Sequence, residues 1–245
     1  VNKGYPVRSC RARGAETCSD EKTEMDVTLS VTTAALTPSI VVDNSKLILP
    51  LVEDAVIPVK VTNIGELSYQ LFRIQDRQIA HSGYLFSNLD GWDINQYQRN
   101  TDLVATGTLT PPDSAAGQVS FNIDVSKLRE GLTGGIYALV LDSPSLDLSR
   151  YNGRPTQWFV RSDIGISLYR GANETVVQLQ RFRDLDVPKG VKLDVISDSN
   201  RLLYSGVADD EGLLRIPNSY LNGRDGAAPA FLMSYSPDGD FSLLN

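Results

Sequence analysis

Residues 119–125 read VSFNIDV, and apolar Val119, Phe121, Ile123 and Val125 alternate there with polar residues. In a strand, residues i and i+2 lie on the same face, so this segment offers one apolar face to a core and one polar face to water. The same alternation recurs in residues 25–32 and 191–195. A period of two along the chain predicts β-strands.

Turn-forming residues separate these segments at short intervals, at 43–45, 110–113, 133–135, 188–190, 209–212 and 236–240. Helical spacing is nearly absent: only residues 124–131 favour about one turn, which glycine ends. Many short strands joined by Asp-, Pro- and Gly-rich turns are typical of antiparallel sandwiches or barrels. The sequence therefore predicts an all-β protein made of tandem antiparallel β-sandwiches of the immunoglobulin or fibronectin III type.

The favoured domain boundary is the polar segment 146–155, which ends in proline. Before it, we expect strands near 46–50, 56–63, 67–74, 76–81, 102–109, 118–124 and 135–142. After it, we expect strands near 157–161, 164–169, 175–181, 191–197, 201–207, 213–216, 229–235 and 240–244. Each set is enough for one sandwich, over 38–155 and 156–245. Residues 1–37 supply one clear strand, near 25–31, and are interpreted as the tail of a preceding unit or an extension.

Composition limits the classes of function. Of the 245 residues, 41% are hydrophobic and 22% charged, enough apolar surface to offset the entropy of ordering a folded chain. No apolar run approaches the roughly 18 residues of a membrane span, so we expect no direct membrane insertion. The net charge of −7 and a pI near 4.8 disfavour nucleic acid and anionic membranes as partners.

The two cysteines, Cys10 and Cys18, lie in a polar segment near the start of the chain. A short loop closed by a Cys10–Cys18 disulfide is the natural interpretation in an oxidising compartment. The alternative is two free thiols in a cytosolic protein. The chain opens without Met and without a basic-then-apolar signal, so we expect a removed signal or a piece of something longer.

Reactive residue types do not combine into a usable site. His81 is the single histidine, and its neighbour Ser82 is too local to serve as the nucleophile of a triad. The acidic clusters 209–212 and 238–240 fit hairpin turns better than calcium loops, because EF-hand spacing is absent. Trp92 could stack on a sugar, although a loop tryptophan more often packs on its own sandwich. We predict no catalytic, cofactor-binding or metal-binding residues.

Residues 156–166, TQWFVRSDIGI, resemble the junction segment of bacterial alpha-2-macroglobulins. The following order is also similar to that family, with VPKGVKLDVI at 187–196, a hairpin from NRLLY at 200–204 to DDEG at 209–212, and APAFL and GDFSLL near the end. Upstream, DNSKLILPLV at 43–52, YQLFRI at 69–74 and GIYAL at 135–139 resemble the start and strands of a preceding macroglobulin domain. The resemblance covers about 43–245.

This resemblance implies two macroglobulin domains from the N-terminal part of a large periplasmic protease trap. In that family, a protease cuts a bait segment and the cleaved protein changes shape and entraps it. Many members carry a thioester in a Cys-x-Glu-Gln motif, but Arg11-Ala12-Arg13 follows Cys10 and Ser19-Asp20-Glu21 follows Cys18. The implied role is thus a scaffold, not an enzyme and without cofactors, with neighbouring macroglobulin domains and, through the intact parent, target proteases as partners.

Two other classes of function remain as alternatives. One is an immunoglobulin-like adhesin or surface module that binds a receptor or glycan through loops such as 86–100, with Trp92 as a contact. The other is a β-sandwich hydrolase with an unrecognised pair of carboxylates. The expected location is the periplasm, and attachment to the inner membrane through another part of the parent is left open.

Overall fold

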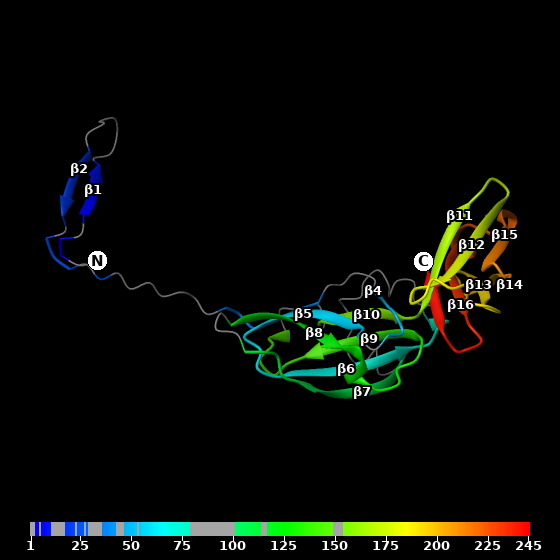
Figure 1. Cartoon of the computed structure of the whole chain (residues 1–245), viewed down its shortest axis with the longest axis horizontal. Helices are drawn as coiled ribbons and strands as arrows, with labels where there is room; N and C mark the ends of the chain where they lie inside the picture. Colours follow the sequence, from blue (N-terminus) through cyan, green and yellow to red (C-terminus); the bar gives the residue numbers. More distant parts are fainter. Residues whose placement is uncertain are drawn as a thin grey trace. The chain divides into compact units, whose positions relative to one another are not determined.

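The computed structural model describes residues 3–4, 6–10, 18–22, 24–26, 28, 36–42, 47–52, 54–78, 101–113, 117–148 and 154–245. The chain divides into two compact units, Val1–Leu36 and Thr37–Asn245, and each is described by itself. Antiparallel sheets make up most of the second unit (Figure 1), which confirms the predicted all-β class. None of the helices in the described ranges has the length and hydropathy needed to cross a membrane.

The N-terminal unit contains one antiparallel hairpin of β1 (Pro6–Cys10) and β2 (Cys18–Lys22), in which Cys10 faces Cys18 across the ladder. This differs from the prediction of a strand at 25–31, because the described residues 24–26 and 28 lie outside strands. The sequence of β2, CSDEK, has no apolar alternation. Hydrophobic periodicity therefore gives no signal for this hairpin.

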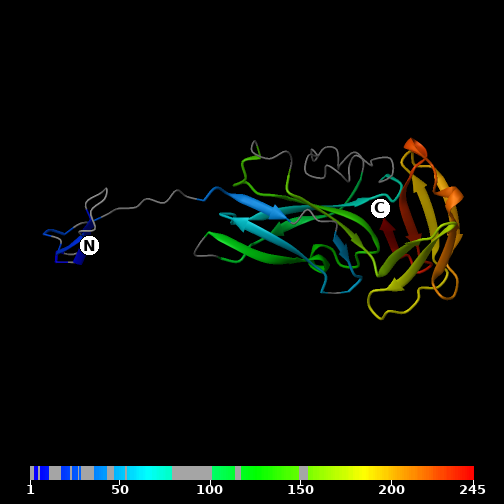
Figure 2. The ribbon, with the colours of Figure 1, turned by 90° about the horizontal axis from the view of Figure 1, so that it is seen from above.

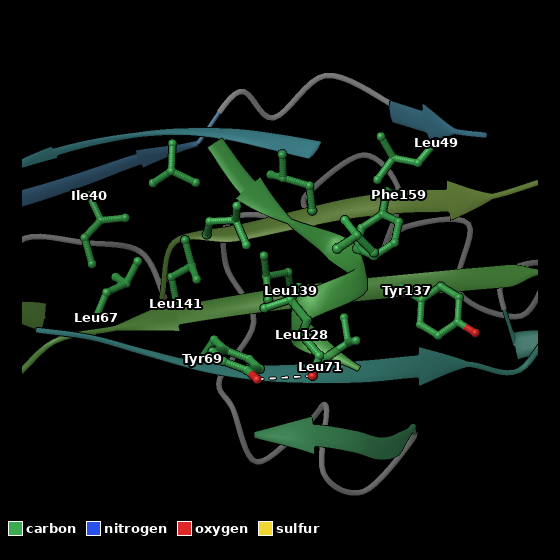
Figure 3. Packing of buried hydrophobic residues seen from close by; sticks show 14 of the residues in the cluster. Ile40, Leu49, Leu67, Tyr69, Leu71, Leu128, Tyr137, Leu139, Leu141 and Phe159 are labelled. Carbon is green, nitrogen blue, oxygen red and sulfur yellow. Dashed lines mark hydrogen bonds between the residues drawn. The ribbon is translucent and has the colours of Figure 1, made fainter. Parts of the chain in front are cut away.

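The first sandwich packs a five-stranded sheet on a three-stranded sheet. The larger sheet has the order β4 (Leu47–Leu49), β10 (Thr156–Arg161), β9 (Gly135–Asp142), β6 (Leu67–Ile74) and β7 (Asp102–Leu109). The smaller sheet has the order β3 (Ser39–Val42), β5 (Val56–Thr62) and β8 (Gln118–Asp124). Alternate residues of both sheets fill the space between them, as Figure 3 shows for Leu139 and Phe159 of the larger sheet and Ile40 of the smaller one.

The one-turn helix α4 (Val125–Leu128) follows β8 directly, which confirms the turn predicted at 124–131. Asp124 begins it as a cap, because its carboxylate accepts a hydrogen bond from the backbone N–H of Ser126 at 2.9 Å. Its end is tied to the core by the Tyr69 hydroxyl, which donates to the carbonyl of Leu128 at 3.2 Å (Figure 3). Val125 and Leu128 are buried, so this turn covers part of the first core.

The second sandwich packs a three-stranded sheet on a four-stranded one. The orders are β11 (Ile164–Arg170), β12 (Glu174–Arg181) and β15 (Leu213–Pro217), and β14 (Leu202–Val207), β13 (Lys192–Ser197), β16 (Pro229–Tyr235) and β17 (Phe241–Leu244). Its core lies between the two sheets and is built around Val177, Leu179, Leu193 and Ile164. Figure 2 shows this sandwich, coloured yellow to red, adjoining the first.

Two strand placements differ from those predicted from the sequence. The predicted strand 76–81 begins as a turn at Asp76 and Arg77, and 79–81 lie outside the described residues. Strand β10 was expected to open the second sandwich, but it pairs antiparallel with β9 and parallel with β4, within the five-stranded sheet of the first. The reason is that every residue of β10 is buried, so both of its faces need a partner layer.

Candidate functional site at the junction of the sandwiches

The structure describes only some of the residues singled out for chemistry. His81 and Trp92 both lie outside the described residues. Cys10 and Cys18 lie in the N-terminal hairpin. Among the described residues, no three metal-ligating side chains come together as a metal site would require.

The acidic cluster 209–212 forms the turn between β14 and β15. One carboxylate oxygen of Asp209 accepts hydrogen bonds from the backbone N–H groups of Glu211 at 3.0 Å and Leu213 at 2.8 Å. Gly212 follows with a φ of +76°, a left-handed conformation that favours glycine. Asp209 therefore has a structural role in this turn.

Replacing Asp209 by alanine is expected to lower the free energy of unfolding by about 1–2 kcal/mol, because two backbone donors lose their acceptor. Urea denaturation followed by circular dichroism measures this. The matched control is Asp210→Ala in the same turn, since no hydrogen bond of the Asp210 side chain is recorded in the structure. An equal loss in both variants would contradict the capping role.

The candidate site is the junction where the two sandwiches meet, and β10 is its central element. Phe159 points into the first core and stacks on Tyr137, with ring centroids 5.5 Å apart. Its neighbours Trp158 and Val160 point the other way, toward the second sandwich. One strand therefore contributes to two apolar clusters at once.

The junction cluster joins the outer face of the five-stranded sheet to the outer face of β13, β16 and β17. From the first sandwich come Phe72, Ile74, Ile136, Ala138, Val140, Trp158 and Val160. From the second come Ile196, Phe231, Met233 and Phe241. The exposure of Trp158 is 6%, so its indole is removed from water by this contact. Burial of apolar area on this scale fixes the two layers against each other.

Only Ser162 and Asp163 connect β10 to β11, and both are buried. The backbone N–H of Ser162 donates to the carbonyl of Leu49 at 3.0 Å in the first sandwich. The Ser162 hydroxyl accepts from the N–H of Ile164, also at 3.0 Å. This two-residue connection is thus held by hydrogen bonds on both sides, and no extended linker separates the two sandwiches.

Asp163 anchors this connection to the loop after β12. One carboxylate oxygen accepts from the backbone N–H of Arg183 at 3.0 Å. The other lies 3.3 Å from Arg183 Nη2 and 3.7 Å from Arg181 Nη1. Since the Asp163 side chain is 2% exposed, these two cations compensate a carboxylate that has left water.

Asp240, at the start of β17, completes the junction. Its Oδ2 accepts from the backbone N–H of Asp163 at 2.9 Å and its Oδ1 from that of Phe241 at 2.7 Å. Gly134, from the turn before β9 in the first sandwich, lies against it. A Cβ added to Gly134 would come within 2.9 Å of the Phe241 nitrogen and 3.0 Å of the Asp240 Cα. Only glycine permits this approach without a shift.

Burial raises the pKa of the Asp240 carboxyl above the usual 3.8, although hydrogen bonds from Asp163, Ser162 and Phe241 act against it. The folded chain then binds this proton more tightly than the unfolded chain. The stability that the protonated Asp240 carboxyl adds to the folded chain is present below pH 3.8. This stability is lost as the pH rises through the higher pKa of the folded chain. We expect a carboxyl ¹³C titration midpoint above 3.8 for Asp240; a midpoint at or below this value would contradict the dominance of burial.

Polar contacts surround the apolar cluster. Arg77, after β6, donates from Nε to the Asn200 side-chain oxygen at 2.8 Å and from Nη2 to its carbonyl at 2.6 Å. Burial, helped by the charges of Asp76 and Asp194, raises the pKa of Tyr235 to about 12. These groups belong to both sandwiches, so the junction has an apolar centre and a polar rim, as stable protein interfaces do.

A hollow of about 250 Å³ lies in the second sandwich, between β11, β16 and the end of β17. Leu168, Val195 and Leu232 contribute apolar walls, while Arg170 and Thr175 are among its few polar residues. No acid–base pair or nucleophile with a base lines it, so it adds no catalytic group to the described part of the chain.

The two sandwiches are thus held together by strand β10 and by a buried polar connection. Residues 161–245 match the family model described as the bacterial alpha-2-macroglobulin MG3 domain. A curated relative, alpha-2-macroglobulin of Escherichia coli strain K12, is 22% identical over 227 residues, which cover 90% of this chain. The chain spans 13% of the length of that relative.

Solved structures show the same fold. The native E. coli alpha-2-macroglobulin fragment spanning domains NIE-MG1 aligns with a TM-score of 0.69 and 21% identity, over 87% of this chain and 99% of that one. A fragment spanning MG0-NIE-MG1 gives a TM-score of 0.65 and 19% identity, over 94% and 68%. The Y1175G mutant of Salmonella alpha-2-macroglobulin gives 0.60 and 18%, over 94% and 13%.

Sequence reasoning missed the junction residues. Gly134 was seen only as part of a turn, and Asp240 only as part of an acidic cluster, because the contact between them spans two sandwiches. A signal was nevertheless present in β10. Its consecutive residues Trp158, Phe159 and Val160 are all apolar, so both faces of the strand carry apolar side chains. An apolar run without alternation is typical of a strand buried on both faces.

Proposed function

We propose that this chain is a rigid two-sandwich scaffold section of a bacterial alpha-2-macroglobulin-like inhibitor of endopeptidases. The observation that carries the proposal is β10, which belongs to the first sheet and packs its other face on the second sandwich. Such a strand fixes the position of one sandwich relative to the other, and this role needs no reactive side chain. The scaffold holds its neighbours in a fixed arrangement, while the intact parent meets the protease.

The finer parts of this proposal concern the parent protein. Its partners are target proteases and the neighbouring macroglobulin domains of the same chain. Its location is the periplasm, where an oxidising environment also suits a Cys10–Cys18 disulfide. The similarity to alpha-2-macroglobulin of Escherichia coli supports a parent in which further macroglobulin domains adjoin this chain. As a scaffold, the chain has no enzymatic activity of its own.

An immunoblot of native periplasm tests the proposal, with antibodies raised on this chain and samples taken before and after a broad-specificity protease is added. We expect a parent several times larger than 26.8 kDa that is cut into two large stable pieces. A native band near 26.8 kDa that the protease leaves unchanged would overturn the inhibitor assignment.

The purified chain alone is expected to inhibit no protease, because a scaffold section does not enclose its target. Residual protease activity on a large protein substrate, measured over a range of chain concentrations, checks this. A mixture with bovine serum albumin at the same concentrations controls for substrate competition. Inhibition that rises with dose beyond this control would assign the inhibitory surface to this chain and refute the scaffold role.

A further inference from the structure

We propose that the hollow of the second sandwich binds a short aliphatic carboxylate, with the alkyl chain inside the hollow and the carboxylate on Arg170. The hollow has a volume of about 250 Å³. Water takes about 30 Å³ of liquid volume, so there is room for roughly eight groups of the size of a water molecule or a methylene. This inference goes beyond the scaffold function and does not depend on it.

The strand register points Leu168 and Arg170 of the edge strand β11 into the sandwich. Leu168 lies opposite Val177 of β12, and Arg170 lies opposite Thr175. Directly opposed residues of an antiparallel pair lie on the same face, and Val177 and Thr175 are 0% and 1% exposed. Leu168 nevertheless remains 38% exposed, and Arg170 is exposed as well. The sandwich is therefore open beside the second half of β11.

The opening lies where the opposing sheet is short. β17 ends at Leu244, opposite Leu232 of β16, whereas β16 begins three residues earlier, at Pro229. Behind the opening, the hollow is lined by Val195, Ile216 and Leu232, each of which is at most 5% exposed. All three belong to the core of this sandwich. A ligand in the hollow would thus contact the apolar core directly.

The polar groups of the hollow favour an anionic head group. Among the described residues that line it, Arg170 has the only charged side chain. No described residue forms an ion pair with Arg170. The Thr175 hydroxyl already donates to the side-chain oxygen of Asn218 at 2.9 Å. A carboxylate can therefore pair with the guanidinium through two N–H···O bonds, whereas a cationic head group would be repelled.

An alkyl chain suits the interior of the hollow better than a polypeptide segment does. A peptide carries an N–H and a C=O group at nearly every residue, and each costs free energy when it is buried without a hydrogen-bond partner. The inner walls are leucine, isoleucine and valine side chains, which offer no such partner. An alkyl chain needs none, so its burial is favourable along its whole length.

The two parts of the ligand should contribute separately to its affinity. Each methylene that enters the hollow should strengthen binding about fourfold, the effect of burying one CH₂ group. Loss of the Arg170 charge should weaken carboxylate binding by up to about fivefold, the effect of one exposed ion pair. The same loss should leave binding of an uncharged alcohol of equal length unchanged.

Isothermal titration calorimetry of the full chain tests the site, with hexanoate, heptanoate and octanoate below their micelle concentrations. We expect one ligand per chain and about 16-fold tighter binding of octanoate than of hexanoate. Arg170→Met should weaken octanoate and not octanol. The matched control Arg201→Met, at an exposed arginine of the same sandwich outside the hollow, should bind like the unmodified chain. Leu168→Trp should remove binding of both ligands, because the larger inward-facing side chain fills the hollow.

Three results would each overturn the proposal. Absence of saturable binding, or an affinity that does not depend on chain length, would show that no alkyl chain enters the hollow. Unchanged binding in Leu168→Trp, with the circular dichroism of the chain intact, would place the ligand elsewhere. Tighter binding of a capped peptide of alternating leucine and serine than of octanoate would identify the hollow as a polypeptide site. The scaffold proposal would stand after each result, because it rests on the junction residues.

Discussion

Replacing Trp158 by alanine is expected to lower the free energy of unfolding by about 3–5 kcal/mol, the usual cost of removing a buried aromatic side chain. The indole is 6% exposed and packs in the junction cluster with residues of both sandwiches. The cavity would therefore open between the sandwiches and not within either core. Guanidinium denaturation followed by far-ultraviolet circular dichroism gives the loss, and hydrogen exchange shows where it falls.

We expect the W158A variant to lose exchange protection on β10 and also on β13, β16 and β17, which face it across the junction. The matched control is Leu103→Ala on β7 of the same sheet, where the side chain is 51% exposed. Its effect should stay within about 0.5 kcal/mol. A loss confined to the first sandwich, or one no larger than that of L103A, would contradict the view that Trp158 joins the two.

Much of the fold could be predicted because local alternation and turn chemistry act over a few residues. β8 illustrates this: Phe121 and Ile123 face inward while Ser120 and Asn122 are exposed, as the VSFNIDV pattern requires. The strands of the second sandwich fall within one or two residues of the predicted ranges. Each of these strands buries one face. The alternation of apolar and polar residues is therefore enough to locate it in the sequence.

Strand β10 could not be assigned in the same way. Its apolar residues occupy both faces, and the identity of each partner layer depends on contacts far away in the sequence. One partner, β4, pairs with it in parallel from residues 47–49, a long-range pairing that no local pattern encodes. A proline just before the strand suggested a domain boundary, whereas the break in sheet membership comes at Ser162 and Asp163.

The candidate site was hidden from the sequence for a related reason. A catalytic or metal site requires particular reactive residues, which a sequence can reveal by type and spacing. A junction uses ordinary residues such as Gly134, Ser162 and Asp240, whose role depends only on position. The resemblance of the TQWFVRSDIGI segment to bacterial alpha-2-macroglobulins nevertheless covered this region, because the segment runs from β10 through the connection into β11.

Replacing Gly134 by alanine is expected to destabilise the chain by about 1–3 kcal/mol, the cost of overpacking a close contact. The added Cβ would meet backbone atoms of Asp240 and Phe241, which cannot rotate away as a side-chain end can. The strain must therefore separate the turn before β9 from the start of β17. Since these two belong to different sandwiches, we expect the distance between them to change as well as the stability.

Spin labels on exposed Leu103 of β7 and Val207 of β14 report this distance by double electron–electron resonance. We expect one narrow distance distribution for the parent chain and a shifted or broader one for the G134A variant. The matched control is Gly65→Ala in the first sandwich, where an added Cβ meets nothing within 4 Å and φ lies outside the left-handed range. That variant should keep the narrow distribution and its stability, because alanine there also restricts the unfolded chain. An unchanged distance distribution in G134A would show that the Gly134–Asp240 contact does not fix the arrangement of the two sandwiches. The rigid-scaffold proposal would then lose the support that it draws from this contact.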